Sequence, residues 1–214
     1  MSDTRIVLIR HGESRATVER FVGGPRSCTG LTQRGREQAE ALRDRLMNGY
    51  DIAPTAVYSS HFPRALETAQ ILSPALGSLS SQVVAGWGEH DPGPECDGMS
   101  YVDFVAQHSQ IDWDGDPNGV IFPGGETVAQ FQKRVMETLR QTVRDNESGT
   151  VAVVCHGGVI DAVMRIVLHG PATGKFELHT QNTSLTEVVH VSGSKWKLVR
   201  YNDVAHLLGS SLLT

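Results

Sequence analysis

The sequence predicts an α/β fold, a three-layer sandwich in which a mostly parallel central sheet carries helices on both faces. Residues 6–9 and 151–155 are apolar runs rich in β-branched side chains, which is typical of central strands buried on both faces. Amphipathic helical patterns alternate with strand patterns along the chain, and this alternation indicates parallel strands joined by helices. The chain has 214 residues, of which 39% are hydrophobic, so we expect a single domain over residues 1–214.

After the first strand, the first half of the chain predicts a loop, a helix, a second strand and a second helix. A Gly-rich polar stretch at 23–30 is expected to be loop. Thr32 suits the N-cap of a helix over 33–47, where apolar residues recur at helical spacing. Residues 55–60 predict the second strand, and Pro63 suits the first turn of the helix that follows.

The second half predicts a similar alternation that ends in a hairpin. Apolar residues at helical spacing predict an amphipathic helix over 126–144. The strand at 151–155 is followed by a predicted helix over 158–168. The last strands, 184–191 and 195–201, are separated by a short Ser-Gly-Ser turn, so they are expected to pair and to make the sheet mixed.

The middle of the chain interrupts this pattern. Residues 82–87 predict one more strand. From Gly88 to Gly125, Pro, Gly and Asp dominate, and the one short apolar patch lies at 101–106. We expect loops and one helix here, inserted over one end of the sheet.

Composition excludes several classes of protein. With 19 basic and 24 acidic residues the net charge is −5, which argues against a general nucleic-acid binder. No apolar run approaches the roughly 20 residues needed to span a bilayer, and the N-terminus does not fit a signal peptide. Cys28, Cys96 and Cys155 form no Cys-x-x-Cys pair, so we expect buried thiols in a reducing compartment and a cytoplasmic protein. Four leucines near the C-terminus suit either the chain's own sheet or a subunit contact, and the oligomeric state stays open.

Two predicted strands end in His-Gly. The stretch "RIVLIRHGES" ends on Arg10 and His11, and "TVAVVCHGGV" ends on His156. In α/β sheets the ligand crevice lies outside the carboxyl ends of the strands. Ser60 follows the second strand at the same edge, and Arg64 begins the next helix. We therefore expect these five side chains to converge on one site.

Two arginines and two histidines suit phosphoryl transfer. The guanidinium group matches phosphate oxygens, and a neutral histidine can attack phosphorus. Backbone N–H groups at the helix start near Gly157 can stabilise the equatorial oxygens. A metal site at His11 and His156 is the alternative, but neither corner has the spacing of metal ligands. A single strand that ends in His-Gly is also typical of a half-buried histidine beside a surface arginine. Two such strand ends favour a functional site. We expect no metal and no cofactor.

Five ordered segments resemble the histidine phosphatase superfamily, also called phosphoglycerate mutase-like. They are "LIRHGES" at the start of the chain, "GLTQRGREQAEAL", "VYSSHFPRALETAQIL", "FPGGETVAQFQKRV" and "VAVVCHGGVIDAV". The resemblance implies a phosphoglycerate mutase-like fold. It also implies that His11 is the nucleophile that becomes phosphohistidine, with Arg10, Arg64 and His156 around the phosphate.

The resemblance also implies an acid that protonates the leaving oxygen. Its spacing, Glu-x-x-x-Gly after the third strand, fits Glu89, with Glu95, Asp91 and Asp97 as alternatives. Thr17 stands where the family often has a pocket Asn. A hydroxyl can still donate there, so we place Thr17 with Ser60 and Gly157 among the phosphate-binding groups.

The resemblance implies a phosphoric monoester hydrolase of the histidine acid phosphatase type, acting on a small phosphorylated substrate without a metal. A cofactor-dependent phosphoglycerate mutase is the first alternative. It needs cations for a second phosphate, and residues 88–125 contain no Lys or Arg. A non-catalytic member that binds phosphorylated ligands is the second alternative, against which the complete set of site residues argues. No nucleic-acid or membrane partner is expected.

Overall fold

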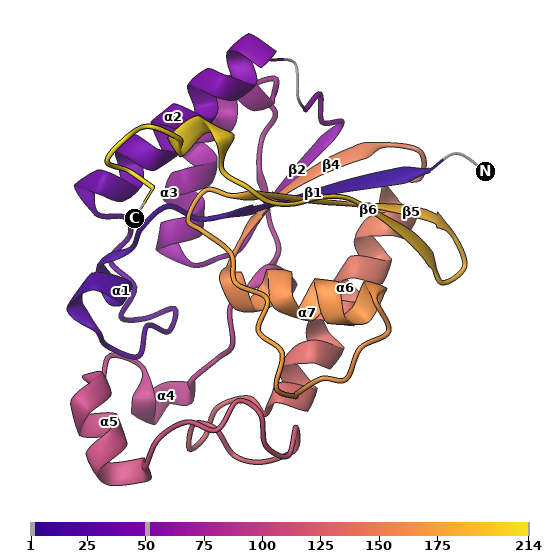
Figure 1. Cartoon of the computed structure of the whole chain (residues 1–214). Coiled ribbons are helices and arrows are strands. Elements are labelled where there is room, and N and C mark those ends of the chain that lie inside the picture. The colour runs from indigo at the N-terminus through magenta and orange to yellow at the C-terminus, as the bar shows by residue number, and fades with distance from the viewer. Residues whose placement is uncertain (1–2, 50–51, 214) are drawn as a thin grey trace.

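The computed structural model describes residues 3–49 and 52–213, which form a six-stranded sheet with helices on both faces (Figure 1). The strand order is β3-β2-β4-β1-β5-β6. The strands are β1 (Thr4–Arg10), β2 (Ala56–Ser59), β3 (Gln82–Val83), β4 (Thr150–Cys155), β5 (Leu185–Ser192) and β6 (Lys195–Asp203).

The sheet is mixed, as the sequence predicts. β1 pairs in parallel with β4, β4 with β2, and β2 with β3, whereas β5 is antiparallel to β1. Ile9 near the end of β1 lies opposite Leu185 at the start of β5. The amino end of β5 therefore reaches the edge of the sheet at which the parallel strands end.

Two pairs of helices cover the sheet. In Figure 1, α2 (Gln33–Gly49) and α3 (Pro63–Leu72) lie on one face, and α6 (Val128–Asp145) and α7 (Gly157–Val167) on the other. The remaining helices are short: α1 (Arg15–Glu19), α4 (Gly93–Cys96), α5 (Tyr101–His108) and three 3₁₀ turns, η1 (Ser73–Leu76), η2 (Ala85–Trp87) and η3 (Ala205–Leu207). No helix in the described ranges is long and apolar enough to cross a membrane.

β1 supplies side chains to both halves of the core. Val7 and Ile9 pack with the cluster under α2 and α3, and Ile6 and Leu8 with the cluster under α6 and α7. All four are fully buried. Each contributes about 1.5–3 kcal/mol of apolar burial, which explains why residues 6–9 contain no polar side chain. The core thus fixes the position of the strand that presents His11.

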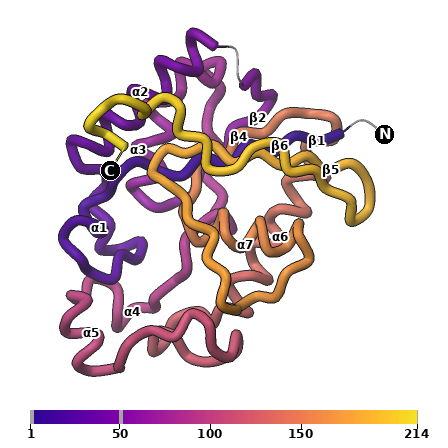
Figure 2. Tube along the Cα trace, viewed as in Figure 1, coloured from indigo at the N-terminus to yellow at the C-terminus, as the bar shows by residue number. Residues whose placement is uncertain are grey.

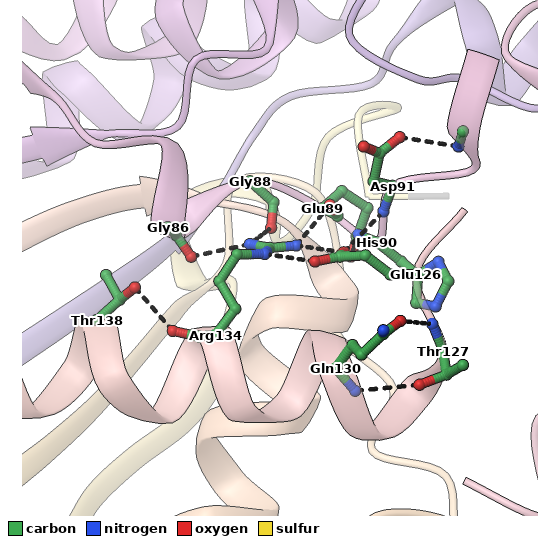
Figure 3. A network of polar contacts seen from close by, with 11 residues as sticks. Gly86, Gly88, Glu89, His90, Asp91, Glu126, Thr127, Gln130, Arg134 and Thr138 are labelled. Atoms are coloured by element: carbon green, nitrogen blue, oxygen red, sulfur yellow. Dashed lines mark hydrogen bonds and ion pairs between the residues drawn. The ribbon is translucent and has the colours of Figure 1, made fainter. Parts of the chain in front are cut away.

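A capping box sets the start of α6. The Thr127 side chain accepts a hydrogen bond from the Gln130 N–H, and the Gln130 side chain accepts one from the Thr127 N–H (Figure 3). Both bonds satisfy N–H groups that have no partner within the helix. The helix therefore begins at Val128, and Glu126 stays outside it.

The structure differs from two expectations and adds one helix for which the sequence makes no prediction. Only Gln82–Val83 of the expected strand at 82–87 pairs with β2, because the chain then turns into η2 and buries the Trp87 ring in the core. The inserted region contains two helices, α4 and α5, instead of one. The loop after β1 contains α1, whose five residues bury only Ala16 and so lack a helical apolar pattern.

The inserted region has its own small core and lies beyond the main sheet (Figure 2). Val22, Cys96, Phe104 and Phe122 form that core. The Asp97 carboxylate connects it to the loop after α1, since it accepts hydrogen bonds from three backbone N–H groups there, those of residues 24, 26 and 27.

Candidate active site

The predicted cluster assembles at the carboxyl edge of the sheet. His11 follows β1, Ser60 follows β2, and His156 lies between β4 and α7. Arg64 lies in the first turn of α3, after Pro63. The side chains of His11, Arg64 and His156 are almost wholly buried, with 4%, 5% and 0% of their residue surface exposed.

Arg64 lies between the two histidines. Its Nε lies 3.2 Å from Nε2 of His11 and 3.3 Å from Nδ1 of His156. The imidazole rings are edge to face, with centroids 5.1 Å apart. Because guanidinium N–H groups only donate, both of these ring nitrogens accept and carry no proton.

The tautomer of His11 is fixed by its neighbour. Its Nδ1 lies 2.7 Å from the carbonyl oxygen of Gly12, which can only accept, so Nδ1 carries the ring proton. The Nε2 lone pair then faces Arg64. Burial first, and the charges of Arg64 and Arg10 second, hold the pKa of His11 well below its usual range. His11 is therefore a neutral imidazole at pH 7, with an unprotonated Nε2.

His156 has the opposite tautomer. Its Nε2 lies 2.7 Å from Oγ of Ser60, which also accepts a hydrogen bond from the Phe62 N–H at 3.2 Å. Burial, followed by the charge of Arg64 and the proximity of His11, lowers the pKa of His156 well below its usual range. Ser60, which we expected among the phosphate-binding groups, is fully buried and does not line the cavity. It contacts the site through His156.

The backbone around His11 is held by the segment before β5. Asn182 donates from Nδ2 to the His11 carbonyl at 2.9 Å, and the Thr183 N–H donates to the Arg10 carbonyl at 3.0 Å. The Arg10 guanidinium donates to the Thr180 carbonyl. From the sequence, Asn182 is interpreted as a turn residue before a late strand, and neither Thr180 nor Thr183 is singled out. These residues directly precede the strand predicted at 184–191. Since this strand is antiparallel to β1, its amino end lies at the edge of the sheet that carries the site.

Glu89 extends over the start of α7. Its Oε2 accepts a hydrogen bond from the Gly158 N–H and its Oε1 one from the His90 N–H, both at 3.0 Å. The positive end of the helix dipole favours a carboxylate at this place. Glu89 lines the same cavity as Arg10 and His11.

The alternative acids lie elsewhere. Asp97 is engaged in the contacts with the loop at 24–27, and Asp91 is exposed and accepts from the Gly93 N–H. Glu95 is exposed on α4. None of the three lines the cavity, so Glu89 is the member of this set that faces the cluster.

The cavity measures about 1220 Å³ and opens from the cluster toward the inserted region. Thr17 and Gly157, both expected at the phosphate, line it; Thr17 is exposed and its Oγ1 lies 3.1 Å from Oγ of Ser14. The far wall is rich in aromatic and apolar side chains: Phe21, Tyr101, Ile111, Trp113, Phe122 and Phe131. Charged side chains, among them Arg165 and Lys175, lie on the α7 side.

The described residues contain no group of three or more His, Cys, Asp or Glu side chains that could hold a metal ion. The cluster consists of cations and imidazoles, which suit an anion with several oxygens. It brings a neutral ring nitrogen, two guanidinium groups and a carboxyl group to one cavity.

Comparisons with known proteins agree with this geometry. A model described as the histidine phosphatase superfamily (branch 1) matches residues 6–204. A metal-independent phosphoserine phosphatase of Arabidopsis thaliana is 30% identical over 220 residues, covering 95% of this chain and 83% of that protein. The phosphoglycerate mutase-like protein 4 of the same plant is 30% identical over 205 residues, covering 94% and 86%.

A solved structure is also similar. A mycobacterial glucosyl-3-phosphoglycerate phosphatase matches with a TM-score of 0.79 at 25% identity, and the match covers 94% of this chain and 99% of that one. The sandwich fold and the resemblance seen in the sequence motifs are thereby confirmed. The family model spans nearly the whole length, from the strand before His11 to the end of the last strand. The chain belongs to the histidine phosphatase superfamily (branch 1).

Proposed function

We propose that this protein is an enzyme that hydrolyses a small phosphorylated substrate without a metal, through a phosphohistidine at His11. One observation carries the proposal: the Gly12 carbonyl fixes the ring proton of His11 on Nδ1, and Nε2 faces the guanidinium group of Arg64. Two similar proteins, the plant phosphoserine phosphatase and the mycobacterial glucosyl-3-phosphoglycerate phosphatase, support hydrolysis as the reaction class.

In the first step, His11 Nε2 forms a bond to phosphorus while the ester P–O bond breaks. The leaving oxygen takes a proton from the Glu89 carboxyl group, which becomes a carboxylate. The ring gains positive charge as it is phosphorylated, and the Gly12 carbonyl, an acceptor for its Nδ1–H, stabilises that charge.

In the second step, water attacks the phosphohistidine. The water oxygen bonds to phosphorus, the P–Nε2 bond breaks, and the Glu89 carboxylate takes the water proton. The products are the free alcohol and phosphate, and both His11 and Glu89 return to their starting protonation states.

The other residues bind the transferring group. Arg10 and Arg64 match its oxygens, and the positive end of the α7 dipole, beside Gly157, favours an anion at this edge of the cavity. The pKa of His156 is low because of burial and adjacent cations. A phosphate dianion offsets both effects, so His156 can take up a proton and donate to a phosphate oxygen once substrate binds.

The test is hydrolysis of p-nitrophenyl phosphate between about pH 5 and 8, with a chelator present, by the wild type and His11→Ala. We expect turnover by the wild type alone, unchanged by chelator and inhibited by vanadate. Phosphoserine, sugar phosphates and 3-phosphoglycerate then form the substrate panel. Loss of activity on chelation would overturn the metal-free mechanism. Bisphosphate-dependent isomerisation of 3-phosphoglycerate without phosphate release would instead favour a mutase.

A further inference from the structure

We propose that Arg134 and Glu126, which lie outside the cluster, are positioning residues for the proton donor Glu89, and this inference rests on the role proposed for Glu89 above. Neither residue lines the cavity. Both contact the short segment that carries Glu89 into it.

The Arg134 guanidinium binds three backbone carbonyl oxygens of the segment at 86–89 (Figure 3). Nη1 donates to the carbonyl oxygens of Gly86 and Gly88 at 3.0 Å each, and Nη2 donates to that of Glu89 at 3.1 Å. Arg134 lies on α6, one turn beyond Phe131, whose ring its guanidinium covers at 5.1 Å. A single rigid, planar group therefore connects the core helix α6 to the segment at 86–89.

Glu126 holds the guanidinium in this orientation. Its Oε1 accepts from Nε of Arg134 at 2.8 Å and its Oε2 from Nη2 at 2.6 Å, which is a bidentate pair. Oε2 also accepts from the Asp91 N–H at 3.0 Å. Burial alone would raise the pKa of Glu126, but these hydrogen bonds outweigh it and the pKa is lowered. The pair thus fixes the backbone on both sides of Glu89.

The segment needs this support because the sheet does not provide it. β3 ends at Val83, and the chain then leaves the sheet through η2. The carbonyl groups that a longer strand would pair across a ladder are bound instead by Arg134. The Glu89 side chain adds its two bonds, to the Gly158 and His90 N–H groups. Its carboxyl position therefore depends on both the α7 terminus and Arg134.

Precise placement matters for proton transfer. A general acid must lie within about 2.6–3.2 Å of the oxygen that it protonates, and a small misplacement by a remote change can cost about 10²-fold. Loosening the segment at 86–89 would therefore weaken protonation of the leaving group. It would leave His11 and Arg64, which are anchored on other elements, in place.

The leaving group distinguishes this role from a general structural one. A nitrophenolate leaves without much help from an acid, whereas an alkoxide must be protonated as it leaves. A fault in the proton donor thus lowers kcat for alkyl phosphates much more than for p-nitrophenyl phosphate. A fault in folding or in the phosphate cradle lowers both to the same degree.

The experiment measures kcat and KM for p-nitrophenyl phosphate and for an alkyl phosphate, glycerol phosphate, in five proteins. These are the wild type, Glu89→Gln, Arg134→Ala, Glu126→Gln and Arg140→Ala. Arg140 is the matched control, an exposed arginine on the same helix α6. Thermal melting and the inhibition constant of vanadate report folding and the phosphate cradle.

We expect Glu89→Gln to lose about 10²- to 10⁴-fold in kcat on the alkyl ester, the range of general acid catalysis, and much less on the aryl ester. Arg134→Ala should lose about 10- to 100-fold in kcat on the alkyl ester and much less on the aryl ester, which is the same split between the two substrates. Vanadate inhibition should be unchanged, and added guanidinium ion should partly restore kcat. Glu126→Gln keeps the side-chain volume and should show a smaller split. Arg140→Ala should match the wild type.

An equal loss on both esters in Arg134→Ala, or no loss, would overturn the positioning role while leaving the proposed hydrolysis intact. If Glu89→Gln itself shows no split, the role of Glu89 fails and the inference fails with it. Should Arg134→Ala not fold, Glu126→Gln decides, because a split there supports the inference and its absence overturns it.

Discussion

The Nε–H of Arg64 lies 3.2 Å from Nε2 of His11, the ring nitrogen that faces the centre of the site. The same N–H lies 3.3 Å from Nδ1 of His156, so one donor holds both rings before substrate binds. The contact leaves Nε2 of His11 unprotonated and places it beside a guanidinium group, a group suited to phosphate oxygens. A substrate phosphate would replace the histidines as the acceptor of this group.

Arg64→Lys is expected to lose about 10²- to 10³-fold in kcat, the effect of removing one preorganised donor. An ammonium ion keeps the charge but lacks the planar fork that reaches the two rings and, through Nη1, the Gly23 carbonyl at 3.3 Å. Steady-state kinetics on p-nitrophenyl phosphate measures this. Retention of near wild-type kcat would show that charge alone, and not geometry, matters here.

Gly158→Ala should impair the enzyme more than Gly157→Ala, its neighbour in the first turn of α7. A Cβ at Gly158 would overlap the Glu89 carboxylate, whereas a Cβ at Gly157 would meet Arg10 Nε at an ordinary 3.5 Å. We expect kcat on an alkyl phosphate to fall about 10- to 100-fold at 158, with the smaller change at 157. Equal losses would contradict the placement of Glu89 against the helix terminus.

Ser60→Ala removes the acceptor for two buried donors, His156 Nε2–H and the Phe62 N–H. We expect the free energy of unfolding to fall by about 1–3 kcal/mol, the cost of unsatisfied buried groups. We also expect kcat/KM to fall about tenfold, because His156 loses its orientation. Ser59→Ala is the matched control, since its Oγ bonds only the Ser60 carbonyl. Urea denaturation and kinetics on both variants test this, and equal behaviour of the two would refute it.

His206→Gln should make stability less dependent on pH. Burial first, and the charge of Arg45 second, lower the pKa of His206 to about 4, against about 6.5 in the unfolded chain. Between these values the unfolded chain binds more protons, so the wild-type free energy of unfolding falls as the pH drops from about 6.5 to about 4. Glutamine keeps the contact with Thr183 Oγ1 and does not titrate. Urea denaturation at about pH 7 and 5 should show a smaller fall in the variant, and an equal fall would contradict the assignment.

The sequence could predict the centre of the site because strand ends are visible in it. His11 and His156 each follow an apolar run, and parallel strands bring their carboxyl ends to one edge. Arg64 could be placed because Pro63 marks the first turn of its helix. These inferences use local patterns, and the structure brings all three side chains together.

The rest depends on contacts between distant segments. Arg134 stands on the polar side of an amphipathic pattern, where a solvated arginine is the usual outcome. Its three backbone acceptors lie 45 to 48 residues earlier in the chain, after a strand whose end the sequence does not mark. Trp87 lies at the end of a pattern that predicts a strand. The chain leaves the sheet before it, and the Trp87 ring is buried in the core from η2. The sequence around Asn182 predicts a turn, and the pairing of β5 with β1 is what places this residue at His11.

The most direct test of the account is to trap the phosphoryl group on the enzyme. Wild-type protein, Glu89→Gln and His11→Ala would be mixed with p-nitrophenyl phosphate and chelator, quenched in alkali and mapped by peptide mass spectrometry. We expect a phosphoryl group on His11 in the wild type, more of it in Glu89→Gln because water attack lacks its base, and none in His11→Ala. Hydrolysis with no phosphorylated His11 peptide, or with turnover preserved in His11→Ala, would contradict it.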